Sequence, residues 1–281
     1  MDLNKILFMA GMASTTYALP CLGNNDTIPP TDSLRNILMD EVIVTNQVNH
    51  LSEIAKVDLQ VSPVNSSQEI LQKLPGLFIA QHAGGGKAEQ LFLRGFDLDH
   101  GTDIHISVDG MPVNMVTHAH GQGYADLHFL QPEAIERIDF DKGPYHADKG
   151  DLATAGYVAF KTKDRMENEV SLELGQYNTQ RYRASFSLLD NDSQSLYVSS
   201  SFLTTDGYFD APQNFDRLNV MAKYTQWNES SRFNIILSHF DSHWDASGQI
   251  PQRVVDKGII GRFGALDDTE GGNTSRTHLN F

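Results

Sequence analysis

The sequence of 281 residues is poor in cysteine, in positive charge and in long apolar runs. Cys21 is its single cysteine, so no internal disulfide can stabilise the fold. Lysine and arginine total 21 against 36 acidic residues, and the formal charge of −15 argues against nucleic acid as a partner. No apolar run approaches the roughly 20 residues of a membrane-spanning helix. Entry into a membrane would therefore require β-strands, because only helices and closed barrels satisfy every backbone group in lipid.

The N-terminus has the pattern of an export signal. A lysine precedes a short apolar core at residues 6–13, and small residues follow through Ala18, a plausible cleavage point. We expect residues 1–18 to be a cleaved signal peptide. The alternatives are a buried N-terminal helix and a lipoprotein signal, which Pro20 directly before Cys21 disfavours.

A linker and a short extended segment follow the signal. Residues 19–39 are polar and contain Pro29-Pro30, which predicts a flexible linker. In residues 40–46, two acidic residues precede a β-branched run that favours extended structure. This run consists of Val42, Ile43, Val44 and Thr45.

Residues 47–163 contain the signals of a mixed α+β domain. Ser66 and Glu69 have the spacing of a helix capping box, and Pro75-Gly76 provides a stop, so a short helix is predicted over 66–76. Pro132 predicts the start of a second short helix. Apolar and β-branched runs predict strands at Leu77–Ala80, Gln90–Leu93, Ile104–Val108 and Ile138–Phe140, with a tight turn at Asp109-Gly110.

From Glu169 onward, apolar and polar residues alternate, and this is the period of a β-strand. About six such stretches occur, the last at Ser275–Phe281. The apolar face would form a core in a soluble sandwich but would meet lipid in an outer-membrane barrel. Short connectors (Asp190–Gln194, Asn228–Ser231) and longer ones (Thr205–Asp216, Asp241–Asn273) fall at opposite strand ends, although Asn178–Gln180 is short on the long side. That asymmetry favours the barrel.

Four phrases in the first half carry a family resemblance. They are Phe92–Phe96 (an apolar–Arg–Gly–aromatic motif), Val108–Val113 (V-D-G-x-P-V), Ile135–Pro144 (I-E-R-I-x-x-x-K-G-P) and the glycine-rich hairpin Gly150–Lys163. Together they resemble the plug domain of TonB-dependent outer-membrane receptors, in family order across residues 40–163. The motif residues carried over are Arg94, Gly95, Asp109, Gly110, Lys142, Gly143 and Gly156. The closing hairpin departs from the family pattern, because it keeps one glycine of the usual pair.

The resemblance implies an α+β plug domain at 47–163, followed by antiparallel β-strands of an incomplete outer-membrane β-barrel at 164–281. Plugged transporters have barrels of about 22 strands. About six cannot close around a plug, and an unclosed sheet leaves unpaired groups in lipid. We therefore expect a truncated chain or fragment that does not transport by itself, derived from a receptor for a scarce nutrient such as a metal chelate.

The resemblance also implies partners and a location. Residues 40–46 take the place of the TonB box, which the C-terminal domain of TonB, with its inner-membrane energising complex, pairs with as an added strand. An ordinary plug strand is the alternative. Other expected partners are outer-membrane lipid and an unknown small ligand, in the outer membrane of a Gram-negative cell, without a cofactor. Arg94 is expected to pair with barrel carboxylates; the alternative is a solvated arginine.

Eleven histidines are present, and His118 and His120 form an H-x-H pair. Others nearby in sequence are His100, His105, His128 and His146. In the family, apical plug loops often contact the ligand, and Val113–Gly123 is expected to be such a loop. Two imidazoles suit a transition metal or its chelate, although polar loop histidines are the alternative, and the metal stays open.

The sequence also allows two other classes of function to be compared with a receptor. A histidine-cluster metalloenzyme is disfavoured, because H-E-x-x-H and G-x-S-x-G are absent and Gln122 breaks the H-x-H-x-D-H pattern. A phosphate-binding loop is disfavoured as well, because the run Gly84-Gly85-Gly86 lacks the rest of that pattern. The run predicts a flexible turn instead. A plug used as a non-transporting ligand-binding or signalling module is the other alternative.

Overall fold

The computed structural model describes residues 64, 66, 68–81, 85–98, 103–115, 118, 124–150 and 152–281. All of them belong to one compact unit, Asn46–Phe281. The expected signal peptide, linker and TonB box lie outside the described residues. None of the helices within these ranges is long and apolar enough to cross a membrane.

The first part of the described chain forms a small antiparallel sheet next to a single helical turn. The helical turn η1 (Glu69–Lys73) is followed by β1 (Leu77–Ala80), β2 (Gln90–Leu93) and β3 (Phe96–Leu98), paired in the order β1-β2-β3. The strands β1 and β2 have the bounds that the sequence predicted. Strand β3 was not predicted, because three residues are too few to show a period.

The predicted helix over 66–76 is wrong in type and length, since η1 is a five-residue 3-10 helix. Half of the expected capping box forms, because the Glu69 amide donates to Ser66 Oγ at 3.2 Å. Gly76 then takes a φ of +82°, which ends the turn. The apolar face is as expected, because Ile70 and Leu71 are buried in the core. The helix expected at Pro132 is likewise a short 3-10 turn, η2 (Pro132–Ala134).

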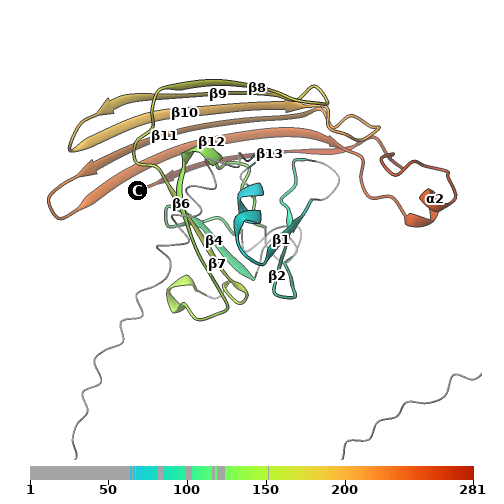
Figure 1. The fold of residues 1–281 in the computed structure, drawn as a ribbon, viewed down its shortest axis with the longest axis horizontal. Helices are drawn as coiled ribbons and strands as arrows, with labels where there is room; N and C mark the ends of the chain where they lie inside the picture. The colour runs from blue at the N-terminus through green and yellow to red at the C-terminus, as the bar shows by residue number, and fades with distance from the viewer. Residues whose placement is uncertain are drawn as a thin grey trace, which may run out of the picture. The chain divides into compact units, whose positions relative to one another are not determined.

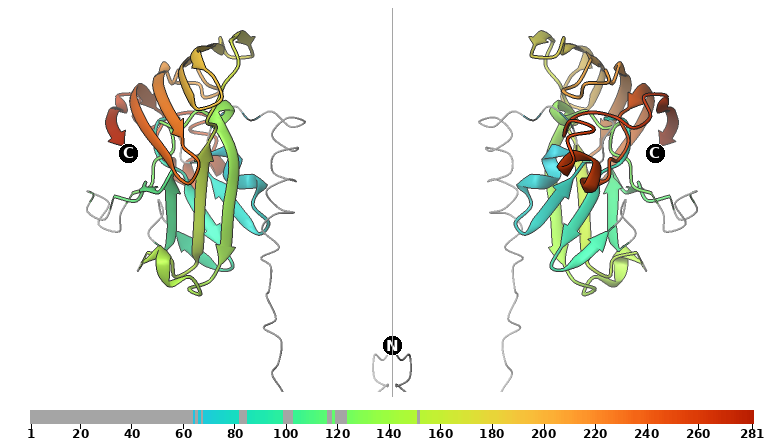
Figure 2. Two further views of the ribbon diagram at one scale, coloured as in Figure 1. Left: turned by 90° about the vertical axis from the view of Figure 1, so that its left-hand side faces the viewer. Right: turned by 90° about the vertical axis from the view of Figure 1, so that its right-hand side faces the viewer.

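A second, mixed sheet completes the plug. Its strands are β4 (Ile104–Val108), β5 (Met111–Pro112), β6 (Ile135–Lys142) and β7 (Gly156–Thr162), in the order β5-β4-β7-β6, with the turn η3 (Ala147–Lys149) before β7. The central pair, β4 and β7, is parallel, whereas the other pairs are antiparallel. Figure 2 shows this sheet in green and teal. The α+β character predicted for this part of the chain is confirmed.

The second half is a six-stranded antiparallel sheet in which each strand pairs with its sequence neighbour (Figure 1). Its strands are β8 (Glu169–Leu174), β9 (Gln180–Asp190), β10 (Gln194–Thr205), β11 (Phe215–Trp227), β12 (Arg232–Ala246) and β13 (Glu270–Asn280). The connector between β12 and β13 is shorter than the predicted Asp241–Asn273, because these two strands pair as far as Ala246 and Glu270. The helix α2 (Gln252–Asp256) lies within it and was not predicted.

The faces of this sheet distinguish a soluble sandwich from an outer-membrane barrel. Alternate residues of β11, among them Arg217, Asn219 and Lys223, are buried although they are polar. The apolar residues on the other face are open, and Val170 and Leu237 are 76% and 52% exposed. A sandwich would show the reverse. A polar inner face and an apolar outer face are the arrangement of an outer-membrane sheet.

The main hydrophobic core lies in the plug, and one residue of the sheet joins it. It gathers residues from η1 and from β1, β2, β4, β6 and β7, together with Phe240 of β12. Two smaller clusters lie on the sheet, and one of them contains Ala134 of the plug beside Tyr197 and Met221. The inner face of the sheet is therefore buried by contact with the plug.

Candidate functional site: plug motifs, the plug–sheet interface and the apical loop

Arg94 and Gly95 form the two-residue turn between β2 and β3, where Leu93 pairs with Phe96. Both have positive φ, +50° and +85°. Gly95 meets this requirement at no steric cost, whereas an arginine rarely adopts it. The side chain of Arg94 is exposed. Within the described residues none of the ion pairs contains Arg94, so its pairing with barrel carboxylates stays a prediction.

Asp109 and Gly110 form the predicted tight turn between β4 and β5, with φ of +48° and +82°. Positive φ at both positions is the type I′ geometry for which Asp-Gly is a strong sequence signal. The turn also places a buried negative charge. The Asp109 carboxylate is 1% exposed and forms an ion pair with Lys161, whose Nζ lies 2.6 Å away. The hydroxyl and amide of Thr162 donate to the same carboxylate.

Asp109 is part of a polar cluster that joins the plug to the sheet. The cluster consists of Asp109, Thr162, Asp164, Lys223 and Arg232 and is named the latch; Asp109, Thr162 and Lys223 are its buried centre, and Arg232 is its exposed edge. The Lys223 side chain is 0% exposed, and its Nζ donates to Thr162 O at 3.0 Å and to Thr162 Oγ1 at 2.8 Å. It lies 3.1 Å from Asp164 and 3.8 Å from Asp109. Arg232 of β12 donates to Asp164 at 2.5 Å.

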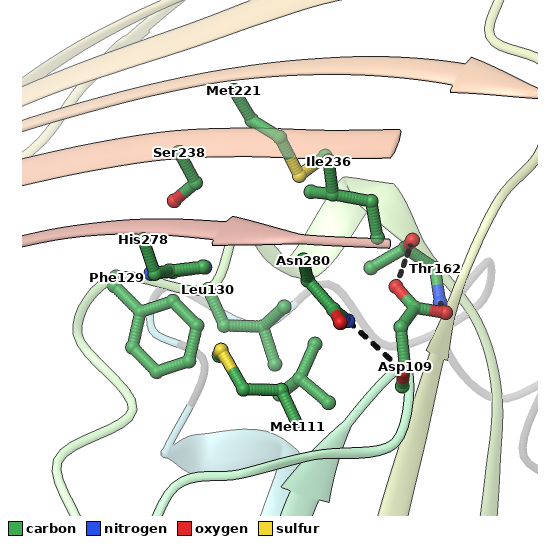
Figure 3. Close-up of a pocket in the computed structure, with 11 residues that line it drawn as sticks. Asp109, Met111, Phe129, Leu130, Thr162, Met221, Ile236, Ser238, His278 and Asn280 are labelled. Atoms are coloured by element: carbon green, nitrogen blue, oxygen red, sulfur yellow. Dashed lines mark hydrogen bonds between the residues drawn. The ribbon is translucent and has the colours of Figure 1, made fainter. Parts of the chain in front are cut away.

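The end of the sheet also contacts the Asp109 turn. Asn280 of β13 donates from Nδ2 to the Asp109 carbonyl at 3.0 Å, as Figure 3 shows. Beside these groups is a small opening between plug and sheet. Its lining is mainly apolar and includes Met111, Leu130 and Ile236. The latch therefore lies at the edge of an apolar contact, where charges are weakly screened by water.

A second charged cluster fixes η2 to the first strands of the sheet. Glu133 of η2 lies 2.9 Å from Arg181 and 3.6 Å from Arg183, both on β9. Arg183 also pairs with Glu173 at 3.1 Å and with Glu169 at 3.3 Å, both on β8. Arg181 is 4% and Glu133 26% exposed, so their pair lies within the interface, whereas Glu169 and Glu173 are 54% and 41% exposed and pair with Arg183 at the edge of the sheet. Sequence reasoning missed both clusters, because it named only Asp109 among their members.

Lys142, Gly143 and Gly156 have a structural role in the β6–β7 connection. Gly156 has a φ of +151°, and a Cβ there would lie 2.3 Å from the Asp141 carbonyl, so only glycine fits. The Gly143 amide donates to the Ala155 carbonyl at 2.7 Å. Lys142 Nζ lies 5.9 Å from the centre of the Phe140 ring. Of the glycine pair that is usual in the closing hairpin of the family, this chain keeps Gly156, and the hairpin geometry requires a glycine at that position.

The glycine run before β2 is a point of close approach to the sheet. A Cβ on Gly86 would lie 2.0 Å from the Trp244 ring of β12, and one on Gly85 would contact Phe215 of β11. Gly85 and Gly86 were predicted to form a flexible turn; the structure adds that a side chain at Gly86 would overlap the Trp244 ring. The absence of side chains allows this plug segment to lie directly against two aromatic rings of the sheet.

His128 belongs to a buried polar network at the interface. Its Nδ1 lies 2.7 Å from Asp126 Oδ1, and its carbonyl accepts a hydrogen bond from Asn219 of β11 at 2.7 Å. Burial opposes ionisation of Asp126, but the charge and hydrogen bonds of His128 outweigh it and lower the pKa of this carboxyl below its usual value. His146 pairs separately with Asp141 at 2.8 Å. These two histidines therefore have carboxylate partners in different parts of the plug.

The base of the apical loop is fixed by strand-like hydrogen bonds. The Val113 amide donates to the Ile106 carbonyl at 2.8 Å, and the Asn114 side chain both accepts from the Ile106 amide and donates to the Ile104 carbonyl. Met115 and Tyr124 form an antiparallel bridge across the loop. His118 stacks on Tyr124 with ring centroids 4.3 Å apart, whereas His120 lies outside the described residues.

Histidines, cysteines and carboxylates do not gather into a metal site in the part of the chain that the structure describes, since no group of three or more was found there. His105, another of the histidines near the loop in sequence, lies on β4, and burial lowers its pKa. The structure thus brings one histidine of the predicted pair to the mouth of the apical loop and places three others elsewhere.

Comparison with known proteins agrees with this architecture. Residues 44–157 match the family model of the TonB-dependent receptor plug domain. The fold is similar to the copper transporter OprC (TM-score 0.54, 18% identity, 66% of this chain and 30% of that chain). It is also similar to the unliganded ferric citrate transporter FecA (TM-score 0.58, 16% identity, 75% and 33%). A third similar structure is the iron transporter FrpB from Neisseria meningitidis (TM-score 0.53, 17% identity, 78% and 34%).

An α+β plug bound to the polar face of an antiparallel sheet is the arrangement of the plug and part of the barrel in these solved structures. Residues 44–157 therefore belong to the TonB-dependent receptor plug domain family, which occurs in outer-membrane proteins. The chain spans about one third of the length of the three structures above.

Proposed function

We propose that this chain is the plug domain and first barrel strands of a TonB-dependent receptor that takes up a scarce metal or metal chelate across the outer membrane. The observation that carries the proposal is the polar inner face of the six-stranded sheet, bound to the plug through the Arg181–Glu133 ion pair and the hydrogen bonds of Lys223 to Thr162.

The apical loop supports the ligand class. His118 is held at its mouth by stacking on Tyr124, and the sequence places His120 two residues later. Imidazoles at this spacing suit a transition metal or its chelate. The names of the three similar structures refer to copper, ferric citrate and iron, which is the same general class of cargo.

The proposed energising partner is the C-terminal domain of TonB. Val42, Ile43, Val44 and Thr45 would pair with it as an added strand, in which backbone hydrogen bonds supply most of the affinity. The family membership and the β-branched sequence support this assignment. Export to the outer membrane through a signal peptide at residues 1–18 is part of the same proposal.

The test is an uptake assay with the complete gene product in outer membranes. Cells carrying the parent receptor, or the double variant His118→Ala and His120→Ala, would be compared for uptake of zinc, copper, haem and ferric siderophores. We expect uptake of one substrate to fall at least about tenfold, the loss expected when a ligand-orienting group is removed. Unchanged uptake of all four at equal surface levels would return both histidines to hydrated loop residues.

A further inference from the structure

Residues 163–168 connect the plug to the six-stranded sheet, and this connection, named the strap, is bound to the sheet along its whole length. It begins after β7 and ends where β8 starts. Its partners come from β9, β10, β11 and β12. They lie towards the ends of these strands that the short connectors join, which is the periplasmic end in outer-membrane barrels.

Two side chains of β10 hold the start of the strap through its backbone. The Tyr197 hydroxyl donates to the Lys163 carbonyl at 3.0 Å, and the Ser195 hydroxyl donates to the Asp164 carbonyl at 2.6 Å. Tyr197 and Ser195 are 1% and 2% exposed, so both bonds are shielded from water. The Asp164 carboxylate is bound as well, as a member of the latch. Bonds to the backbone fix the path of the chain at this point.

Arg165 holds the middle of the strap to two of the short connectors. Its guanidinium donates to Asp190 Oδ1 at 2.7 Å and to the Asn191 carbonyl at 2.6 Å. The same group lies over the Trp227 ring, 4.8 Å from the ring centre. Met166, the next residue, packs against one of the small apolar clusters of the sheet. The middle of the strap is therefore held by polar and apolar contacts together.

The end of the strap is held by β9. The Ser185 hydroxyl donates to the Glu167 carbonyl at 2.7 Å, and the Ser187 amide donates to Asn168 Oδ1 at 2.7 Å. Each of the six strap residues thus contacts the sheet through its backbone or its side chain. The strap is also joined to the plug, because the Lys163 amide donates to the Ala134 carbonyl at 2.7 Å.

The number of these contacts decides how the strap can behave when the plug moves. A single hydrogen bond is weak, but six consecutive residues bound to four strands leave the sheet only if all their contacts break. We propose that the strap stays bound to the sheet throughout uptake and retains the plug inside the barrel, so that any movement that opens a path takes place in the plug residues before it. This inference rests on the proposed uptake function and specifies which part of the receptor does not move.

The first experiment prevents the strap from moving. Ser185→Cys and Glu167→Cys would be introduced into the complete receptor in a Cys21→Ser background, because the contact between Ser185 and Glu167 brings the two positions within reach of a disulfide. Uptake of zinc, copper, haem and ferric siderophores would be measured in oxidised and in reduced cells. The receptor with Ser185→Cys alone is the control, since it cannot form the internal bond.

We expect the oxidised double variant to take up the same substrate as the parent, at the parental rate. A loss of uptake that appears on oxidation, is reversed by a reductant and is absent from the control would show that the strap has to move, and would overturn the proposal.

The second experiment loosens the strap. Ser195→Ala together with Tyr197→Phe removes the two hydroxyls that bind the strap but keeps the packing of β10. We expect the β7 amides to exchange hydrogen about tenfold faster. Cells should also become more sensitive to vancomycin, which is too bulky to pass a plugged barrel. Ser200→Ala together with Tyr224→Phe makes the same chemical change on the opposite face of the sheet and should leave both measurements at the parental level.

Parental exchange and parental vancomycin resistance in the Ser195→Ala, Tyr197→Phe receptor would overturn the anchoring role of the strap. These two measurements require no substrate. They therefore test the strap even if the parent takes up none of the four substrates, a result that would overturn the proposed function alone.

Discussion

At the residue scale, the contact between plug and sheet depends on buried charges. Lys223 has no exposed side-chain surface, yet it lies among Asp109, Thr162 and Asp164. Without Lys223, Asp109 would keep only Lys161 and Asp164 only Arg232, and the space that Lys223 fills would hold no cation in a medium that solvates carboxylates poorly. The latch is therefore expected to hold the plug more strongly than any surface ion pair of the described chain.

The first residue-scale prediction is that Lys223→Met lowers the free energy of unfolding of the plug by about 3 kcal/mol, because two carboxylates lose a buried cation. Urea unfolding in detergent and hydrogen exchange of the β7 amides would measure the effect. Arg137→Met is the control, because Arg137 is 52% exposed and pairs with Asp139 at the surface. The control should cost less than about 1 kcal/mol. Equal effects of both variants would contradict the role of the latch.

A second residue-scale prediction concerns pH. Burial, and then the charge of Glu69, raise the pKa of Glu89 to about 7. The folded plug holds this proton more tightly than the unfolded chain, so its stability falls as pH rises from the usual glutamate range towards 7. Glu89→Gln should therefore stabilise the plug at pH 8 by on the order of 1 kcal/mol, allowing for partial exposure, and should give no gain near pH 4.

Urea unfolding at the two pH values would measure this difference. Glu69→Gln provides an independent check, since it removes the second cause and should shift the loss of stability to lower pH without removing it. A gain from Glu89→Gln of the same size at both pH values would show that packing, rather than ionisation, is responsible.

At the element scale, short extended segments have defined roles in this chain. The two-residue turns at Arg94-Gly95 and Asp109-Gly110 join neighbouring plug strands. The segment 42–45 is proposed to pair with a strand of another protein. Because such pairing uses backbone groups, its side chains can vary while its amide groups cannot be removed.

The element-scale prediction is that the segment 42–45 tolerates a changed side chain but not the loss of a backbone amide. A peptide of residues 40–46 with Val44→Pro should lose binding to the C-terminal domain of TonB, because proline removes a backbone donor. Val44→Ile keeps the amide and the β-branched shape, so it should bind as the parent does. Isothermal calorimetry would measure both affinities. A proline peptide that bound as tightly as the parent would show that residues 42–45 are not the TonB box.

At the scale of the whole molecule, the outer face of the sheet requires an apolar environment. Val170, Leu174, Leu188 and Leu237 are each more than half exposed, on the face of the sheet opposite to the one that carries the buried Arg217 and Lys223. An apolar surface of this extent is not stable in water and is typical of contact with lipid.

The corresponding prediction is that Leu237→Arg lowers the stability of the receptor in a bilayer by about 2–4 kcal/mol if the residue lies near the midplane. Surface biotinylation and unfolding in liposomes would measure the folded receptor. Leu237→Phe is the control, because it keeps the face apolar and should leave the folded level unchanged. Parental levels of folded Leu237→Arg receptor would place this face away from lipid.

The sequence by itself determined the α+β plug, the six alternating strands and the tight turn at Asp109-Gly110. These features depend on local properties: the period of apolar residues, the conformational freedom of glycine, and Asp-Gly at a turn with positive φ. The helix at 66–76 was overestimated, because a capping signal acts over one turn and cannot specify how far the helix continues. The end of β12 was also misplaced, since pairing with β13 extends it to Ala246.

Tertiary structure alone decided which face of the second-half strands is buried. The alternation by itself fits a sandwich and a barrel; connector lengths and the family resemblance favoured the barrel, but only the structure shows Arg181, Asn219 and Lys223 lying against the plug. It also decided the partners of Asp109, whose turn is local but whose carboxylate contacts residues about 50 and 110 positions away. Contacts between distant residues leave no periodic signal in a single sequence, so the latch and the close approach of Gly86 to Trp244 could not be predicted from it.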